Sequence, residues 1–218
     1  MRSFLVAAAK PFAALVALAA WTIAAHWLFS DSSHPRTAIL FAWAPIAAAT
    51  VLLTRTSAHR VAWLAAVAVA TLLIGFVTPG HDLDPSLLWQ FQYLAMQAAL
   101  GAFFGRTLLP GREPLVTRFA RLVHGDLPPR MARYTRQVTI AWAVFFALMA
   151  AVAIALYAFA SRELWSAFVN LLTIPCVLAM FVAEYSIRRL RFPGFEHSSL
   201  LAGAQAFHRA FMRRDPPP

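Results

Sequence analysis

The chain has 218 residues, of which 61% are hydrophobic and only 13% are charged, and its 19 basic and 9 acidic residues give a formal net charge of +10. Soluble domains carry roughly 25% charged and about 45–50% apolar residues, so this composition excludes an ordinary soluble globule and a disordered chain. The apolar content also argues against a nucleic-acid-binding protein, so we expect the basic charge to face a lipid bilayer.

Six apolar segments approach the roughly 17–25 residues that a transmembrane helix needs. They cover residues 12–29, 38–53, 61–77, 87–105, 138–160 and 164–187. The second and third are the shortest, and Pro45 lies inside the second, so whether each of these two crosses fully stays open. The sequence predicts an all-α membrane protein with about six transmembrane helices.

The distribution of Lys and Arg predicts the orientation of these helices. If the N-terminus lies in the cytoplasm, all but two of the 19 basic residues fall on the cytoplasmic side, the exceptions being Arg36 and Arg162. Cytoplasmic loops of membrane proteins are enriched in Lys and Arg. We therefore expect both termini to lie in the cytoplasm.

Four segments follow one another in the predicted organisation. They are a four-span half at 1–105, a basic cytoplasmic loop with an interfacial helix at 106–137, a two-span hairpin at 138–191, and a basic amphipathic tail at 192–218. In the loop and in the tail, apolar residues recur at helical spacing while arginines lie elsewhere on the helix. This pattern is typical of helices that lie in the membrane interface.

The loop offers a basic surface. Arg118 and Arg121 fall off the apolar stripe formed by Leu115, Val116 and the residues one and two turns later, and Arg130 follows shortly after. Arginines near a bilayer attract anionic headgroups, each contributing about 1 kcal/mol. We predict that Arg118, Arg121 and Arg130 face anionic lipid headgroups or an acidic partner protein, with a specific anionic ligand as the alternative.

Glu184 is the main ionisable residue within a predicted span, where such residues are costly and are candidates for function. Arg188 lies one turn further along the same helix, which favours an i, i+4 ion pair. Thr139, on the preceding span, is expected at similar depth, so Arg136, one turn nearer the cytoplasm, is a second candidate partner. From the sequence, Glu184 can either form a structural ion pair or take part in proton or substrate handling.

Five further residues belong to this candidate polar cluster. Asn170 shares a helical face with Glu184, since their spacing is close to a whole number of turns. The cluster consists of Arg133, Arg136, Thr139, Asn170, Glu184 and Arg188.

Known catalytic and cofactor-binding motifs are missing from the sequence. It contains no H-E-x-x-H, C-x-x-C or G-x-S-x-G and no phosphate-binding glycine pattern. The seven histidines are not paired at helical spacing. We therefore predict no cofactor, no metal ion and no catalytic residue, while the question of enzymatic activity stays open.

Residues 114–191 carry several blocks in a fixed order: P-L-V-T-R-F-A-R-L at 114–122, D-L-P-P at 126–129, R-Y-T-R at 133–136 and A-E-Y at 183–185. This order resembles that of a family of small multi-pass inner-membrane proteins from bacterial gene clusters for aryl-polyene and xanthomonadin-type pigments. Those genes lie beside genes for acyl carrier proteins, ketosynthases, acyltransferases and exporters. The resemblance implies a bacterial inner-membrane step in making or exporting a lipid-like polyene ester, and it brings no catalytic residues with it.

Two hypotheses about function follow. The first is a non-enzymatic accessory protein whose partners are the bilayer, anionic headgroups and an acyl carrier protein or other biosynthesis or export proteins, without nucleic acid. The second is a membrane-embedded enzyme or lipid carrier with an interfacial pocket formed by Arg133, Arg136, Asn170 and Glu184. A closed ion pair at Glu184 favours the first hypothesis, and an open polar cavity at the same depth favours the second.

Overall fold

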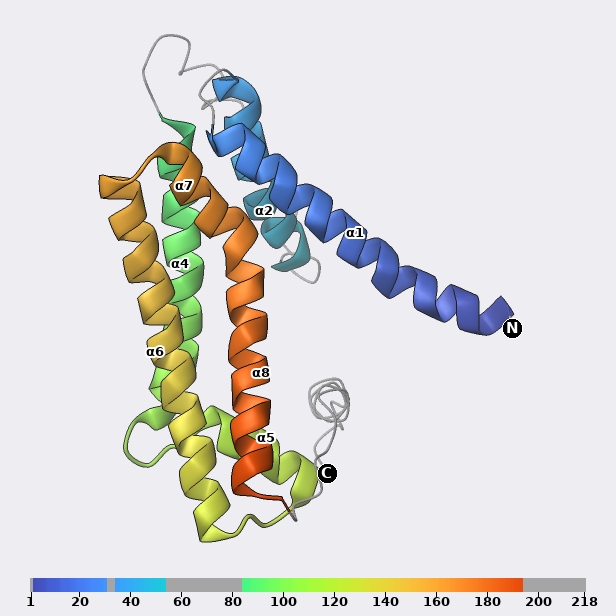
Figure 1. Cartoon of the computed structure of the whole chain (residues 1–218), viewed down its shortest axis with the longest axis vertical. Coiled ribbons are helices and arrows are strands. Elements are labelled where there is room, and N and C mark those ends of the chain that lie inside the picture. The colour runs from blue at the N-terminus through green and yellow to red at the C-terminus, as the bar shows by residue number, and fades with distance from the viewer. Residues whose placement is uncertain (1, 31–33, 54–83, 194–218) are drawn as a thin grey trace. The chain divides into compact units, whose positions relative to one another are not determined.

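The computed structural model describes residues 2–30, 34–53 and 84–193, and within these ranges all regular secondary structure is helical (Figure 1). The all-α prediction is therefore confirmed for this part of the chain. The helices are α1 (Arg2–Ser30), α2 (Pro35–Leu53), α4 (Pro85–Gly105), α5 (Leu115–His124), α6 (Pro129–Phe159), α7 (Arg162–Ser166) and α8 (Thr173–Arg191). A short 3₁₀ helix, η1 (Arg106–Leu108), follows α4, and a π-helical segment, η2 (Ala167–Leu172), joins α7 to α8.

Within the described residues, three helical stretches are long and apolar enough to cross a membrane: Ala13–Ser30, Pro129–Phe159 and Arg162–Arg191. They match the first, fifth and sixth predicted spans, and their length and composition fit a membrane protein. Large apolar side chains on these helices are exposed, among them Trp27, Leu148 and Val182. Lipid tails are as apolar as these side chains, so their exposure is harmless in a bilayer and unfavourable in water.

Of the remaining predicted spans, some lie within the described residues and one does not. The fourth is helical as α4, but Gln90, Gln92 and Gln97 interrupt its apolar character. The third, at 61–77, lies outside the described residues, and so does the tail from residue 194 onwards.

The contacts group the chain into two units. The first comprises residues 1–94 and 152–175, and the second comprises residues 95–151 and 176–218. The helices α4 and α6 and the helical stretch Arg162–Arg191 each contribute to both units. The units therefore differ from the predicted segments 1–105, 106–137, 138–191 and 192–218, which follow chain order.

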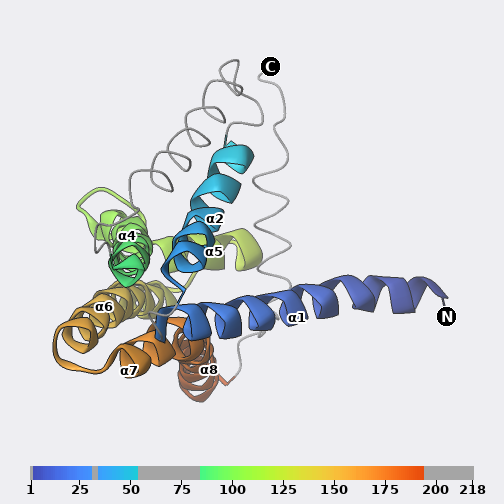
Figure 2. The ribbon, with the colours of Figure 1, turned by 90° about the horizontal axis from the view of Figure 1, so that it is seen from above.

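In the first unit, α1 packs against α2, α7 and η2, and both views show it beside α7 (Figures 1 and 2). Fully or almost fully buried alanines, such as Ala25, Ala42 and Ala153, let the helix backbones approach closely. Aromatic rings fill the space between them, with Phe29 stacked on Trp89 at 4.7 Å between centroids. Small and large residues thus complement each other in this core.

The core of the second unit lies on one face of α6. It consists of residues three or four positions apart: Met131, Tyr134, Val138, Trp142 and Phe146. Such spacing places side chains on one stripe of a helix. Residues of α4, α5 and α8, among them Phe104, Val116 and Val177, pack against this stripe.

Candidate functional site

The helix predicted in the basic loop is present as α5, and threonines from other elements hold its N-terminus. Its N-cap residue, Pro114, makes no side-chain cap. Instead, the Leu115 amide donates to Thr107 Oγ1 at 3.0 Å, and the Val116 amide donates to Thr139 Oγ1 at 3.2 Å. The first amides of a helix have no partner within the helix, so these two bonds supply the missing acceptors.

A third threonine contact shows which face of α5 is buried. The hydroxyls of Thr117 and Thr135 lie 2.8 Å apart, and both residues are buried. Leu122, which belongs to the predicted apolar stripe, is instead 48% exposed. The apolar pattern correctly predicts the helix, but the buried face of α5 is partly polar because threonines on α6 form hydrogen bonds with it. The helix ends at Gly125, whose φ of +73° favours glycine.

The predicted basic surface is exposed. Arg118, Arg121 and Arg130 are all exposed to the surroundings of the protein. Arg121 forms an ion pair with Glu113, at 3.0 Å. The guanidinium of Arg130 lies over the ring of Phe192, at 5.6 Å from its centroid. Both arginines keep free N–H donors in these arrangements, because a guanidinium carries five.

Glu184 lies against Arg188 and Tyr134. Arg188 Nε is 3.4 Å from Glu184 Oε1, without the alignment of a hydrogen bond, so the contact is an ion pair. The Tyr134 hydroxyl donates to the Glu184 carbonyl oxygen at 3.1 Å and reaches Oε1 at 3.4 Å. The side chain of Glu184 is only 14% exposed. The carboxylate is thus enclosed by two partners.

The other predicted cluster residues do not converge on this carboxylate. Arg133 and Arg136 are exposed on α6, and Tyr134, between them in sequence, occupies the buried face. Thr139 is fully buried and donates to the Thr135 carbonyl at 2.9 Å while it caps α5. Equal depth along two helices is therefore not enough for contact, because the side chains must also face each other.

Asn170 belongs to the first unit and to a different network. Its side-chain oxygen accepts a hydrogen bond from Trp89 Nε1 at 3.0 Å, and its amide nitrogen donates to the carbonyl and hydroxyl oxygens of Ser166 at 3.0 and 3.1 Å. Of the six predicted cluster residues, the structure brings Glu184 and Arg188 together as an ion pair.

Ser166 and His26 form a contact that sequence reasoning missed. Ser166 Oγ lies 3.2 Å from His26 Nδ1 and donates to the His26 carbonyl oxygen at 3.1 Å. The Ser166 hydroxyl also accepts a hydrogen bond from the Asn170 amide nitrogen, so it is engaged on several sides within the packed helices. The pair joins α1 to α7.

A second missed contact supports the same packing. Trp165 Nε1 donates to Gln90 Oε1 at 2.8 Å, and both side chains are buried. Polar residues in predicted spans are the available signal, but the sequence does not say which of them pair across helices. These satisfied bonds position helices and leave little polar capacity for a ligand.

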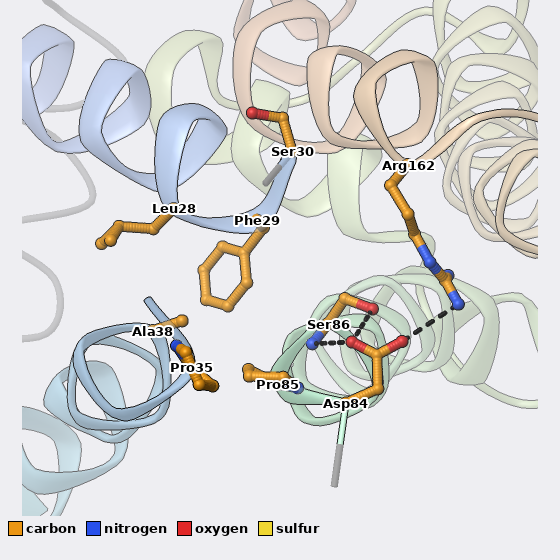
Figure 3. A pocket seen from close by; sticks show the side chains of 9 residues that line it. All are labelled: Leu28, Phe29, Ser30, Pro35, Ala38, Asp84, Pro85, Ser86 and Arg162. Carbon is orange, nitrogen blue, oxygen red and sulfur yellow. Dashed lines mark hydrogen bonds and ion pairs between the residues drawn. The ribbon is translucent and has the colours of Figure 1, made fainter. Parts of the chain in front are cut away.

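One pocket in the first unit has a polar wall. It lies where α1, α2, α4 and α7 begin or end, and Asp84, Ser86 and Arg162 line one side (Figure 3). Burial by itself would raise the pKa of Asp84, but hydrogen bonds from Ser86, the charge of Arg162 and a hydrogen bond from Tyr157 outweigh it and hold the pKa below its usual range. Asp84 is therefore a stable carboxylate near neutral pH.

Among the described residues, no group of three or more His, Cys, Asp or Glu side chains is arranged to hold a metal ion. Comparison of the chain with protein-family models, curated proteins and solved structures finds no match.

Proposed function

We propose that the chain is an accessory protein of a bacterial inner membrane, with six transmembrane helices and both termini in the cytoplasm. In this proposal it supports membrane-associated synthesis or export of a polyene or other lipid-like product and catalyses no step itself. Three apolar helices and the uneven distribution of Lys and Arg support the topology. The order of motifs in residues 114–191 supports the link to polyene products.

The observation that carries the accessory role is the fixed, basic helix α5. Threonines of η1 and α6 bind its N-terminal amides and Thr117, so its orientation on α6 is defined. Arg118 and Arg121 on this helix are exposed. The described part of the second unit holds ten arginines and only three acidic residues. Such a surface attracts anionic headgroups and acidic proteins, and acyl carrier proteins are the partner class that the gene-cluster resemblance implies.

The test is a double charge reversal on this surface, Arg118→Glu with Arg121→Glu. We expect loss of co-purification of acidic partner proteins from membranes, with normal protein level. Arg36→Glu is the matched control, since Arg36 is also exposed but lies outside the second unit. Unchanged co-purification of every partner with the double variant would contradict the accessory role. Deleting the gene and identifying the lipid precursor that accumulates would then identify the blocked step.

The alternative is a membrane-embedded enzyme or lipid carrier that uses Glu184. It predicts that Glu184→Gln abolishes product formation at normal protein level, whereas the accessory role predicts normal product. The enclosure of Glu184 by Arg188 and Tyr134 favours the accessory role, because a carboxylate engaged in this way is not open to a substrate.

A further inference from the structure

The pocket beside Asp84 has two chemically different walls (Figure 3). Its volume is about 240 Å³. Asp84, Ser86 and Arg162 form the polar wall, and an apolar wall opposite contains Leu28, Phe29, Pro35 and Ala38. An enclosure of this kind suits a molecule with one polar and one apolar end.

The carboxylate of Asp84 has no acceptor capacity left for a ligand. Its Oδ1 accepts hydrogen bonds from the amide and the hydroxyl of Ser86, at 2.9 and 2.6 Å. Its Oδ2 accepts from the Tyr157 hydroxyl at 3.2 Å and pairs with Arg162 Nη2 at 3.0 Å. A carboxylate offers about four lone-pair positions, and all are used here. The pocket is therefore not a cation site.

Arg162, in contrast, is held in place with donors to spare. Its guanidinium lies over the ring of Tyr157, 3.9 Å from the centroid, while Nη2 binds Asp84. The side chain remains 43% exposed, and Asp84 is its one ion-pair partner among residues 2–30, 34–53 and 84–193. Two fixed contacts orient the planar group, which then needs little ordering to bind a carboxylate or phosphate.

We propose that this pocket binds the anionic head of an amphipathic molecule, with its carboxylate or phosphate oxygens on Arg162 and the start of its apolar chain against Leu28, Phe29 and Pro35. The volume is below the roughly 300–1,000 Å³ of pockets that enclose a whole drug-sized ligand. The head and first carbons therefore fit inside. The rest of the chain would extend along the exposed apolar side chains of α1, such as Trp27. This site does not depend on the proposed accessory role.

Long-chain carboxylic acids and phospholipids both carry such a head, and native mass spectrometry distinguishes them by adduct mass. The full-length protein in detergent is offered oleate or phosphatidylglycerol in separate experiments. We expect one retained equivalent of one of them. Arg162→Gln should lower the retained fraction about tenfold, because a charge-assisted pair of hydrogen bonds is lost. Arg36→Gln, an exposed arginine outside the pocket, should retain as much as the unaltered protein.

A second measurement covers the case in which Arg162→Gln does not fold. The unaltered protein is offered methyl oleate, which has the same chain without the charge, and we expect about tenfold less retention than for oleate. The proposal would be overturned if neither oleate nor phosphatidylglycerol formed a one-to-one adduct. The proposal would also be overturned if folded Arg162→Gln retained the ligand as well as the unaltered protein does. Where oleate is the ligand, equal retention of methyl oleate and oleate by the unaltered protein would overturn it too. None of these outcomes bears on co-purification of partner proteins, so failure of this site leaves the accessory role untouched.

Discussion

Replacing Thr139 by valine tests whether α6 holds the N-terminus of α5. Valine has nearly the shape of threonine but lacks the hydroxyl that accepts the Val116 amide at 3.2 Å and donates to the Thr135 carbonyl at 2.9 Å. The helical backbone hydrogen bond that the Thr135 carbonyl accepts within α6 is unaffected. The substitution therefore removes the acceptor of one helix-terminal amide without opening a large cavity.

The magnitude follows from the kind of bond that is lost. Removal of a helix N-cap costs about 1 kcal/mol, and a side-chain hydrogen bond between transmembrane helices contributes on average about 0.6 kcal/mol. We expect a loss near 1 kcal/mol, which corresponds to roughly fivefold more opening of the first turn of α5. The loss is local, because the Leu115 amide keeps its bond to Thr107.

Hydrogen exchange followed by mass spectrometry measures this opening directly. The peptide that covers α5 should exchange about fivefold faster in Thr139→Val, while peptides of the first unit are unchanged. Thr22→Val is the matched control, since within the described part of the chain the Thr22 hydroxyl bonds to the carbonyl of Ala19 in its own helix. Unchanged exchange of α5 in folded Thr139→Val would refute the idea that Thr139 positions the basic helix.

Two further predictions concern the first unit. The pKa of Asp84 is lowered in the folded protein, so its stabilising effect is present above the unfolded pKa of about 3.9 and is lost as the pH falls through the folded value. The difference in melting temperature between the unaltered protein and Asp84→Asn should therefore be constant from pH 7 to pH 5 and shrink below about pH 4. This difference should be small, because the ion pair with Arg162 is partly exposed. A difference that grows on acidification would contradict the predicted pH dependence. Ser166→Ala should lower the free energy of unfolding by about 1 kcal/mol in thermal unfolding, because His26 and Asn170 lose a shared partner. Ser30→Ala should not, since the Ser30 hydroxyl bonds to the Trp27 carbonyl within α1.

Elements with a strong local signal were predictable from the sequence. The apolar length of residues 138–160 and 164–187 predicts two spans, and the structure places helices at Pro129–Phe159 and Arg162–Arg191. Apolar periodicity also predicts α5, which is present at Leu115–His124. Both patterns depend on neighbours within a few turns, so a single sequence is enough to reveal them.

Contacts between helices were harder to predict, as Glu184 shows. Counting residues from the turn near Arg162 places Arg136 within one turn of the depth of Glu184, but Tyr134 makes the contact. Depth depends on rise along the helix, whereas contact also depends on rotation about its axis. Neighbouring residues differ by about 100° in rotation, so Tyr134 and Arg136 point in different directions. The same limit explains why the pairs His26–Ser166 and Gln90–Trp165 were missed.

Arg162 shows how the structure changes the meaning of a sequence feature. In the charge distribution it is one of two basic residues left on the outer side, an exception to the pattern that predicts the orientation. In the structure its charge is balanced by Asp84, and its flat face is covered by Tyr157. The orientation is predicted from all 19 basic residues, of which only two fall on the outer side, so the presence of Arg162 there is compatible with the proposed topology. The contact that balances its charge and the ring contact also hold its guanidinium at the polar wall of the pocket.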